Sequence, residues 1–269
     1  MNIKEIGRCS MFSSDFKENF IIYTEFDGSI HFQDKKLTNV DSYKKFIKFY
    51  PTDSYVFTTT GTRGLTVWER ETGKEIYSYP RENLFDHSYS KNCILASFDE
   101  FNIKFYDLRT RYLINSFQQP NLKKIEWCEQ YLYCLDDTKL SIIDYRKGGN
   151  SVLDINEVLD FCICNGNCYY LTKKLKSSHS HTKVLSEMFL NDANKVEVLE
   201  KDVSYKSIQT IFDNSKIAGI LNDGFKIESQ GNIESFHFNN ISPIKIHLSK
   251  DLGYLFTSSH LYKLQGSID

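Results

Sequence analysis

The sequence lacks the features that would divide it or attach it to a membrane. Only four prolines interrupt 269 residues, at positions 51, 80, 120 and 243, and no linker or low-complexity tract separates two halves. No apolar run approaches the roughly 20 residues that a membrane-spanning helix needs. The first residues, Met1–Arg8, lack the apolar core of a secretory signal. These absences favour one soluble intracellular domain spanning residues 1–269.

The net charge and the cysteine content indicate which partners and which cellular compartment to expect. The net charge of −2 gives no whole-molecule attraction to nucleic acid, although a local basic patch stays open. Seven cysteines, an odd number at irregular spacing, fit reduced thiols better than a disulfide framework. We therefore expect a cytoplasmic protein, with the nucleus as the alternative compartment.

Motifs for catalysis are also missing. There is no phosphate-binding glycine loop, no Gly-x-Ser-x-Gly elbow and no His-Glu-x-x-His helix. The nearest approach to a metal site is Cys162, Cys164 and Cys168, with His179 or His181 as a fourth zinc ligand. Buried cysteines commonly act as small apolar residues, and we favour that interpretation. The sequence predicts no enzyme activity, no catalytic residue, no cofactor and no metal.

The stretch from Gly61 to Pro80 sets the pattern for the rest of the chain. Leu65–Trp68 is a short β-rich run, Glu71–Lys74 carries turn residues, and Glu75–Tyr79 resumes an extended pattern. Tryptophan followed by an acid at a strand end, and then by a charged turn with glycine, is a loose form of the signature of a propeller blade.

The same order of strand, acidic residue, turn and strand recurs at a regular spacing along the chain. Tyr106-Asp107 and Ile143-Asp144 take the place of Trp68-Glu69 in two further copies. Strand starts that follow the period are Ile30, Leu65, Ile103, Leu140, Val184, Phe225 and Leu261. Their mean spacing of about 38 residues is close to the repeat length of propellers built from four-stranded units. The sequence predicts an all-β, seven-bladed WD40-like propeller of four-stranded antiparallel blades.

The two ends of the chain are expected to share the last blade. The seventh unit, which begins at Pro243, is one strand short, whereas Asn2–Ile6 precedes the first unit and alternates apolar with polar residues. We predict that this N-terminal strand completes the seventh blade and closes the propeller, because closure removes exposed sheet edges.

Several polar and aromatic residues have structural interpretations. Trp68, Phe105, Tyr106 and Trp127 fit positions in blade cores. Two acids that end strands are expected to bond backbone amides rather than to act as catalytic acids; they are Asp107 and Asp144. The pair Asp136-Asp137, followed by Thr138-Lys139, fits a solvated turn.

The best functional candidate is a basic connector. Thr172–Lys183 is longer than a tight turn, and its lysines could contact phosphate or an acidic partner. The candidate contact residues are Lys173, Lys174, Lys176 and Lys183. The competing interpretation is an ordinary solvated loop.

As a whole the chain resembles WD-repeat propellers in period and strand grammar, although it lacks their Gly-His pairs and has no true Trp-Asp. A narrower likeness involves the order of residues 65–74, 122–127, 156–161 and a lengthened basic hairpin that ends at 186–189. This order looks like the propellers of the b subunit of eukaryotic translation initiation factor 3 and of the monomeric initiation factor 2A. Those propellers are larger, with nine blades.

The resemblance implies a non-catalytic scaffold that mediates protein–protein contacts in translation initiation. It would rest against the small ribosomal subunit, with the basic hairpin as one contact to ribosomal RNA. The alternative is a scaffold subunit of another intracellular complex, in ribosome biogenesis, the nucleus, trafficking or ubiquitin-ligase adaptation. Fold alone does not decide between them.

Overall fold

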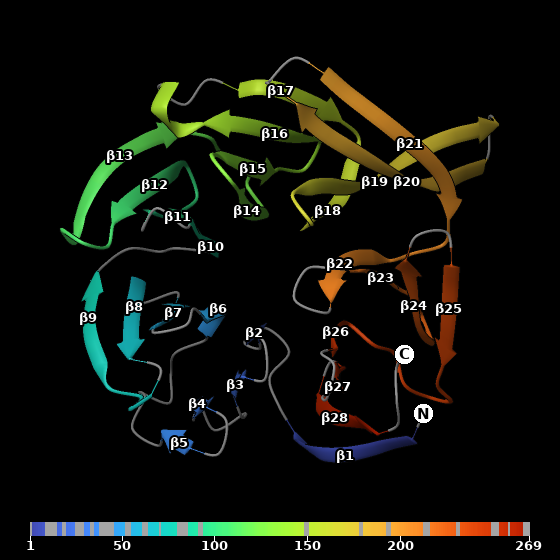
Figure 1. Cartoon of the computed structure of the whole chain (residues 1–269), viewed down its shortest axis with the longest axis horizontal. Helices are drawn as coiled ribbons and strands as arrows, with labels where there is room; N and C mark the ends of the chain where they lie inside the picture. The colour runs from blue at the N-terminus through green and yellow to red at the C-terminus, as the bar shows by residue number, and fades with distance from the viewer. Residues whose placement is uncertain are drawn as a thin grey trace. The chain divides into compact units, whose positions relative to one another are not determined.

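Short strands follow one another along the whole chain of the computed structural model (Figure 1). The structure describes residues 2–8, 15–17, 20–24, 30–32, 35–37, 46–51, 55–60, 64–69, 71–79, 86–90, 94–147, 151–177, 180–191, 195–211, 216–229, 232–248, 253–257 and 259–265. The strands of these residues form seven four-stranded sheets. Six of these seven sheets pair only neighbouring segments of the chain, which is why the sequence period is visible.

The sheets fall into two compact units, which we describe separately: residues 1–121 with 247–269, and residues 122–246. The first unit holds sheets β2–β5 (Asp15–Lys17, Phe20–Thr24, Ile30–Phe32, Lys35–Leu37) and β6–β9 (Phe46–Pro51, Tyr55–Thr60, Gly64–Glu69, Glu75–Tyr79). It also holds sheet β10–β13 (Asp86–Tyr89, Ile94–Phe98, Asn102–Asp107, Tyr112–Gln118). An Asp-Gly pair between two extended runs predicts a tight turn at Asp27-Gly28, and these two residues lie outside the described residues.

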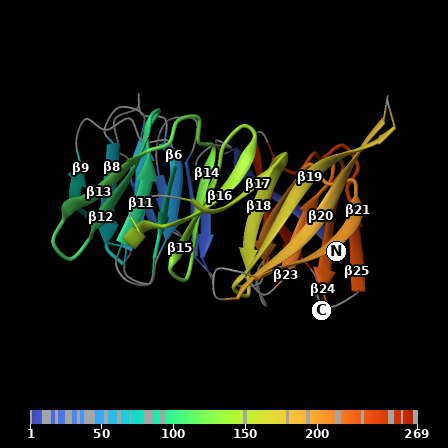
Figure 2. The same ribbon diagram turned by 90° about the horizontal axis from the view of Figure 1, so that it is seen from above.

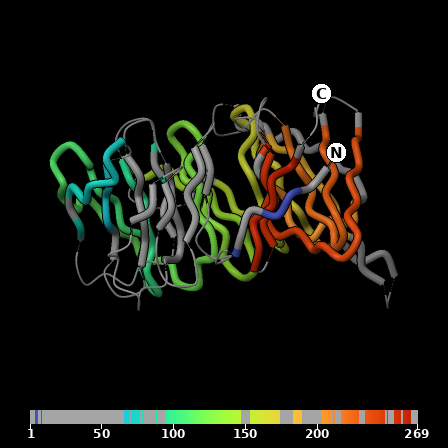
Figure 3. The backbone as a smooth tube through the Cα atoms, turned by 90° about the horizontal axis from the view of Figure 1, so that it is seen from below, coloured from blue at the N-terminus to red at the C-terminus, as the bar shows by residue number. Residues whose placement is uncertain are grey.

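The last sheet has the order β1-β28-β27-β26 (Asn2–Arg8, His260–Gln265, Gly253–Phe256, Lys245–Leu248), and the second unit passes into the first within β26. Strand β1 pairs antiparallel with β28, from Asn2 opposite Gln265 to Arg8 opposite His260. Figure 3 shows the described part of β1, in blue, beside the red C-terminal strands. The N-terminal strand thus supplies the fourth strand of this sheet, and the closure of a propeller by it stays a prediction.

The second unit holds sheets β14–β17 (Lys124–Cys128, Tyr131–Leu135, Lys139–Asp144, Ser151–Asn156) and β18–β21 (Val158–Cys164, Asn167–Ser177, Ser180–Asn191, Lys195–Val203). It also holds sheet β22–β25 (Ser207–Ile211, Lys216–Ile220, Gly224–Ser229, Asn232–His237), and a 3-10 turn at Tyr145–Lys147 follows β16. None of the helices in the described ranges is long and apolar enough to cross a bilayer.

The core of the second unit lies between stacked sheets. Phe161, Ile163 and Met188 of β18–β21 pack against Tyr133 and Ile142 of β14–β17. The opposite face of β18–β21 packs against the β22–β25 sheet, through pairs such as Leu171 and Ile217. A strand that is covered on both faces is buried along its length rather than at alternate positions, as β16 is from Leu140 to Asp144.

The four aromatic residues expected in blade cores are buried: Trp68, Phe105, Tyr106 and Trp127. A bulge recurs on the fourth strand of three successive sheets. One extra residue interrupts the register of β9, β13 and β17, and these residues are Ile76, Ile114 and Val152. Each is 38 positions from the next, so the repeat extends to irregular backbone features as well as to strands.

Candidate interaction surfaces

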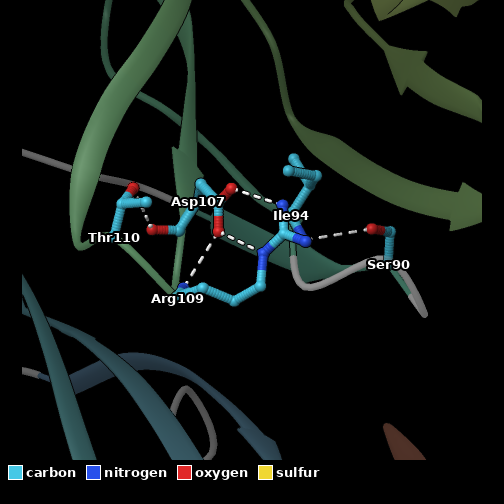
Figure 4. Close-up of polar contacts among 5 residues, drawn as sticks. All are labelled: Ser90, Ile94, Asp107, Arg109 and Thr110. Atoms are coloured by element: carbon cyan, nitrogen blue, oxygen red, sulfur yellow. Dashed lines mark hydrogen bonds and ion pairs between the residues drawn. The ribbon is translucent and has the colours of Figure 1, made fainter.

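Asp107 ends β12 and organises the turn that follows it (Figure 4). Its Oδ1 accepts hydrogen bonds from the Arg109 backbone N–H at 2.9 Å and from Arg109 Nε at 3.0 Å, and its Oδ2 pairs with Arg109 Nη2 at 2.6 Å. The Arg109 side chain, and then its backbone N–H, hold the pKa of Asp107 at about 2. The carboxylate is saturated with donors, so it builds the turn, as the sequence predicted.

Asp144 repeats this device in the next sheet. Its carboxylate accepts bonds from the backbone N–H, Nε and Nη2 of Arg146 at 3.1, 2.9 and 2.8 Å. The two sites share the spacing Asp-x-Arg at a strand end, in which the aspartate is buried and the guanidinium is exposed. The predicted structural role of Asp144 is confirmed.

The paired carboxylates of Asp136 and Asp137 also belong to a turn. Asp136 Oδ1 accepts the backbone N–H groups of Thr138 and Lys139 at 2.7 and 2.8 Å, and exposed Asp137 pairs with Lys123. An acceptor held in this way closes the hairpin. The expected solvated turn is confirmed.

The three cysteines considered as zinc ligands do not converge. A two-residue turn at Asn165-Gly166, both with positive φ, sets Cys164 opposite Asn167 and Ile163 opposite Cys168. Register partners share a face and neighbours along a strand do not, so Cys168 lies on the opposite face from Cys162 and Cys164.

The packing agrees with that register. Cys168 belongs to the core against β14–β17, whereas Cys162 and Cys164 belong to the core against β22–β25. The turn therefore does not bring Cys168 toward the other two, as a shared zinc site would require. Burial raises the pKa of all three thiols. Among the residues that the structure describes, no cluster of histidine, cysteine or acidic side chains could hold a metal ion.

A half-buried ion pair links three sheets of the second unit, and no local sequence pattern pairs its members. Lys124 Nζ of β14 lies 3.0 Å from Asp160 Oδ1 of β18, and it also donates to the Phe161 carbonyl. The other carboxylate oxygen, Oδ2, accepts the backbone N–H of Ile208 in β22 at 3.0 Å. The Asp160 carboxylate therefore links β14, β18 and β22, the first strands of three sheets.

The surroundings of Lys124 favour its charged form. Burial is the largest single influence and lowers the pKa of Lys124, but the charges of Asp160 and Glu126 and the hydrogen bond to Asp160 together outweigh it, so the net pKa is raised. The Lys124 ammonium also lies 4.9 Å from the centroid of the Phe161 ring. The Gln209 side chain of β22 donates a further hydrogen bond to the Ile246 carbonyl of β26. These polar groups bond to one another and to the backbone, so we assign them a role in stability and not in ligand binding.

The basic connector is not a loop. Strand β19 continues to Ser177 and β20 already begins at Ser180, so the expected start near Val184 is corrected. Strand β18 pairs with β19 only as far as Thr172, and β21 pairs with β20 only from Lys183. Beyond these points β19 and β20 pair with no other strand in the part of the chain that the structure describes.

We call this two-stranded extension, Lys173–Ser177 with Ser180–Thr182, the basic arm; Figure 2 shows β19 and β20 running on past their sheet. The strands extend because their backbone groups remain paired without a third strand, although such a ribbon is marginally stable alone.

The four candidate lysines divide into two kinds. Lys173 is exposed at the base of the arm, and Lys174 and Lys176 follow it along β19. Lys183, opposite Lys173, donates from Nζ to the Tyr205 carbonyl at 2.7 Å. The first three remain contact candidates, whereas Lys183 ties the arm to the segment before β22.

No protein-family model matches the chain, and no curated protein matches it. Solved structures do. The β-propeller domain of Myceliophteria thermophila Cps50 (Swd1) aligns with a TM-score of 0.74 and 10% identity over 99% of this chain and 100% of that chain. A chain of the Mitotic Checkpoint Complex aligns with a TM-score of 0.70 and 12% identity, over 97% and 93%. Kluyveromyces lactis Hsv2 aligns with a TM-score of 0.65 and 13% identity, over 81% of this chain and 74% of that chain.

The chain therefore has a WD40-like β-propeller fold, in which the seven four-stranded sheets are the blades. At these identities the likeness shows the fold alone. The predicted fold class is confirmed.

Proposed function

We propose that this protein is a non-catalytic β-propeller scaffold of translation initiation that contacts the small ribosomal subunit through its basic arm. The single observation that carries the proposal is the arm. It is a two-stranded ribbon that extends past its blade and carries Lys173, Lys174 and Lys176 within one short segment of β19. Closely spaced lysines on a projecting ribbon suit the phosphates of folded RNA, which proteins contact without reading sequence.

The chemistry of the rest of the described chain supports a scaffold over an enzyme. The acids Asp107, Asp144 and Asp160 all accept hydrogen bonds from internal donors, and the described cysteines are buried. An enzyme needs a nucleophile, a base or a metal set within reach of one another. The cytoplasm is the compartment that goes with this proposal.

A sedimentation experiment tests it. Small ribosomal subunits are mixed with the wild-type protein and with the triple variant Lys173→Glu, Lys174→Glu, Lys176→Glu over a series of salt concentrations. We expect the wild type to co-sediment in a salt-sensitive way. The triple variant should bind more weakly, and the slope of log affinity against log salt should fall by about 2 to 3, one unit for each lost phosphate contact.

The matched control reverses three exposed lysines elsewhere, Lys4, Lys74 and Lys123, so that the net charge changes equally. It should bind as the wild type does. Equal loss in both variants would mean general electrostatic attraction, and no co-sedimentation of the wild type would contradict the ribosomal proposal.

A second candidate is a scaffold subunit of another assembly, in ribosome biogenesis, the nucleus, trafficking or ubiquitin-ligase adaptation. The similarity to a chain of the Mitotic Checkpoint Complex favours it, since that propeller belongs to a multiprotein complex. Purification of the tagged protein at low salt separates the two candidates. Small-subunit proteins and initiation-factor subunits would support the first, and a defined set of other proteins the second.

A further inference from the structure

The outermost strand of the β10–β13 sheet carries an unusual concentration of exposed apolar side chains. Tyr112, Leu113 and Ile114 of β13 are 73%, 49% and 46% exposed, and Phe101 beside the other end of the strand is 58% exposed. These are four of the eight large exposed hydrophobic residues in the part of the chain that the structure describes. Clustered exposure of this kind marks interaction sites more often than scattered exposure does.

Strand β13 also lacks the usual protection of an edge. Fourth strands end their sheets, and the sequence Tyr-Leu-Ile-Asn-Ser-Phe-Gln of β13 contains no charged residue. Each of the other six strands at this position holds at least one; they are β1, β5, β9, β17, β21 and β25. Charged side chains on edge strands prevent unwanted strand pairing, so their absence leaves β13 open to an added strand.

The bulge at Ile114 limits where such a strand could pair. It interrupts the register between Leu113 and Asn115, which leaves Asn115–Gln118 as a regular edge. Among the described residues no strand pairs with this edge of β13. A bulge also redirects side chains, and here it places large apolar groups next to the regular segment.

The charges at the two ends of β13 are of opposite sign. Exposed Arg109 and Arg111 precede Tyr112, and Arg109 already pairs with the buried carboxylate of Asp107. At the other end exposed Glu100 lies beside Phe101, whose carbonyl accepts the Gln119 backbone N–H. An antiparallel strand added here would place its C-terminal end near the arginines.

We propose that the edge of β13 binds an extended segment of a partner protein as a fifth strand, with apolar side chains against Leu113 and Ile114. Acidic residues near the C-terminal end of that segment lie against Arg109 and Arg111. Main-chain hydrogen bonds supply the affinity in this mode of recognition, and side-chain contacts supply the specificity. This surface is separate from the basic arm and is independent of the function proposed above.

Three labelled peptides test the proposal by fluorescence anisotropy with the full chain. Each alternates threonine and valine; one ends in two glutamates, one ends in two lysines, and one begins with two glutamates. We expect the peptide with C-terminal glutamates to bind about tenfold more tightly than either of the others, a difference set by charges at the exposed rim. Arg111→Glu should reverse the preference between glutamate and lysine peptides.

Ile114→Lys should weaken the binding at least about tenfold, because it places a charge on the contact surface and on the edge. Ile233→Lys is the matched control. Ile233 is 47% exposed on β25, another fourth strand, and its replacement should leave the affinity unchanged. Circular dichroism and thermal melting confirm that both variants fold.

Three outcomes would overturn the proposal. They are absence of binding up to about 1 mM peptide, equal effects of the two isoleucine variants, and equal affinity for glutamate and lysine peptides. Sedimentation velocity gives a further check. Self-association of the wild type that Ile114→Lys abolishes would assign the edge to a second copy of this chain and not to an acidic segment.

Discussion

Replacement of Asp160 by alanine should be among the most destabilising single changes on a polar side chain of the second unit. The change removes the acceptor of the Phe161 and Ile208 backbone N–H groups, at 2.8 and 3.0 Å, and it leaves Lys124 without its carboxylate. The side chains of Lys124 and Asp160 are 30% and 17% exposed, so both ions are mostly withdrawn from water.

The size of the effect follows from these contacts. Removal of one member of a buried ion pair costs about 3–5 kcal/mol, and a hydrogen bond to a charged group contributes about 1.5–3 kcal/mol. Water can reach the partly exposed Lys124 ammonium and soften the loss, so we expect about 3 kcal/mol for Asp160→Ala. Lys124→Met should cost less, because Asp160 would keep both backbone donors.

Urea unfolding, followed by circular dichroism and by tryptophan fluorescence, measures the loss. With a denaturant slope near the upper typical value, the midpoint should fall by about 1 M. The double variant Asp160→Ala, Lys124→Met should be more stable than the sum of the two single losses predicts. The reason is that Lys124→Met removes the charge that Asp160→Ala leaves unpaired.

The surface pair Lys139–Asp154 provides the control in the same unit. Its ions are 3.1 Å apart but 35% and 37% exposed, so Asp154→Ala should change the unfolding free energy by less than about 1 kcal/mol. An Asp160→Ala variant no less stable than Asp154→Ala would refute the reasoning. So would a Lys124→Met variant that is less stable than Asp160→Ala.

Three further predictions concern single groups. The depressed pKa of Asp107 implies stability that is present above its unfolded pKa of about 4 and lost as the pH falls through about 2. Asp107→Asn should flatten this part of a plot of melting temperature against pH. An unchanged plot would exclude the Arg109 pairing as the cause of the pH dependence. Gly224→Ala should destabilise the β22–β25 sheet by at least about 2 kcal/mol in urea, since the new Cβ would lie 1.8 Å from the Phe236 carbonyl oxygen; wild-type stability would show that the strands can separate. Burial raises the pKa of Cys134, so iodoacetamide should label it only after unfolding, as mass spectrometry of its peptide would show; rapid labelling of the native protein would contradict that burial.

Local patterns in the sequence were enough to predict the repeat and its strands. A blade is built from neighbouring segments, so its alternation, turn residues and period of about 38 all lie within one stretch of chain. The turn roles of Asp107 and Asp144 were predictable for the same reason, because their partners are two residues away. The pairing of β1 with β28 followed from counting strands.

Register and long-range packing decided the rest. The two-residue turn at Asn165-Gly166 placed Cys168 on the opposite face from Cys162, and a turn one residue longer would have reversed that result. Asp160 meets Ile208 across 48 positions of sequence, and no local pattern encodes such a contact. Sheet order likewise left β13 at an edge and let β19 and β20 run on as the basic arm, because whether a strand is covered depends on its neighbours in space.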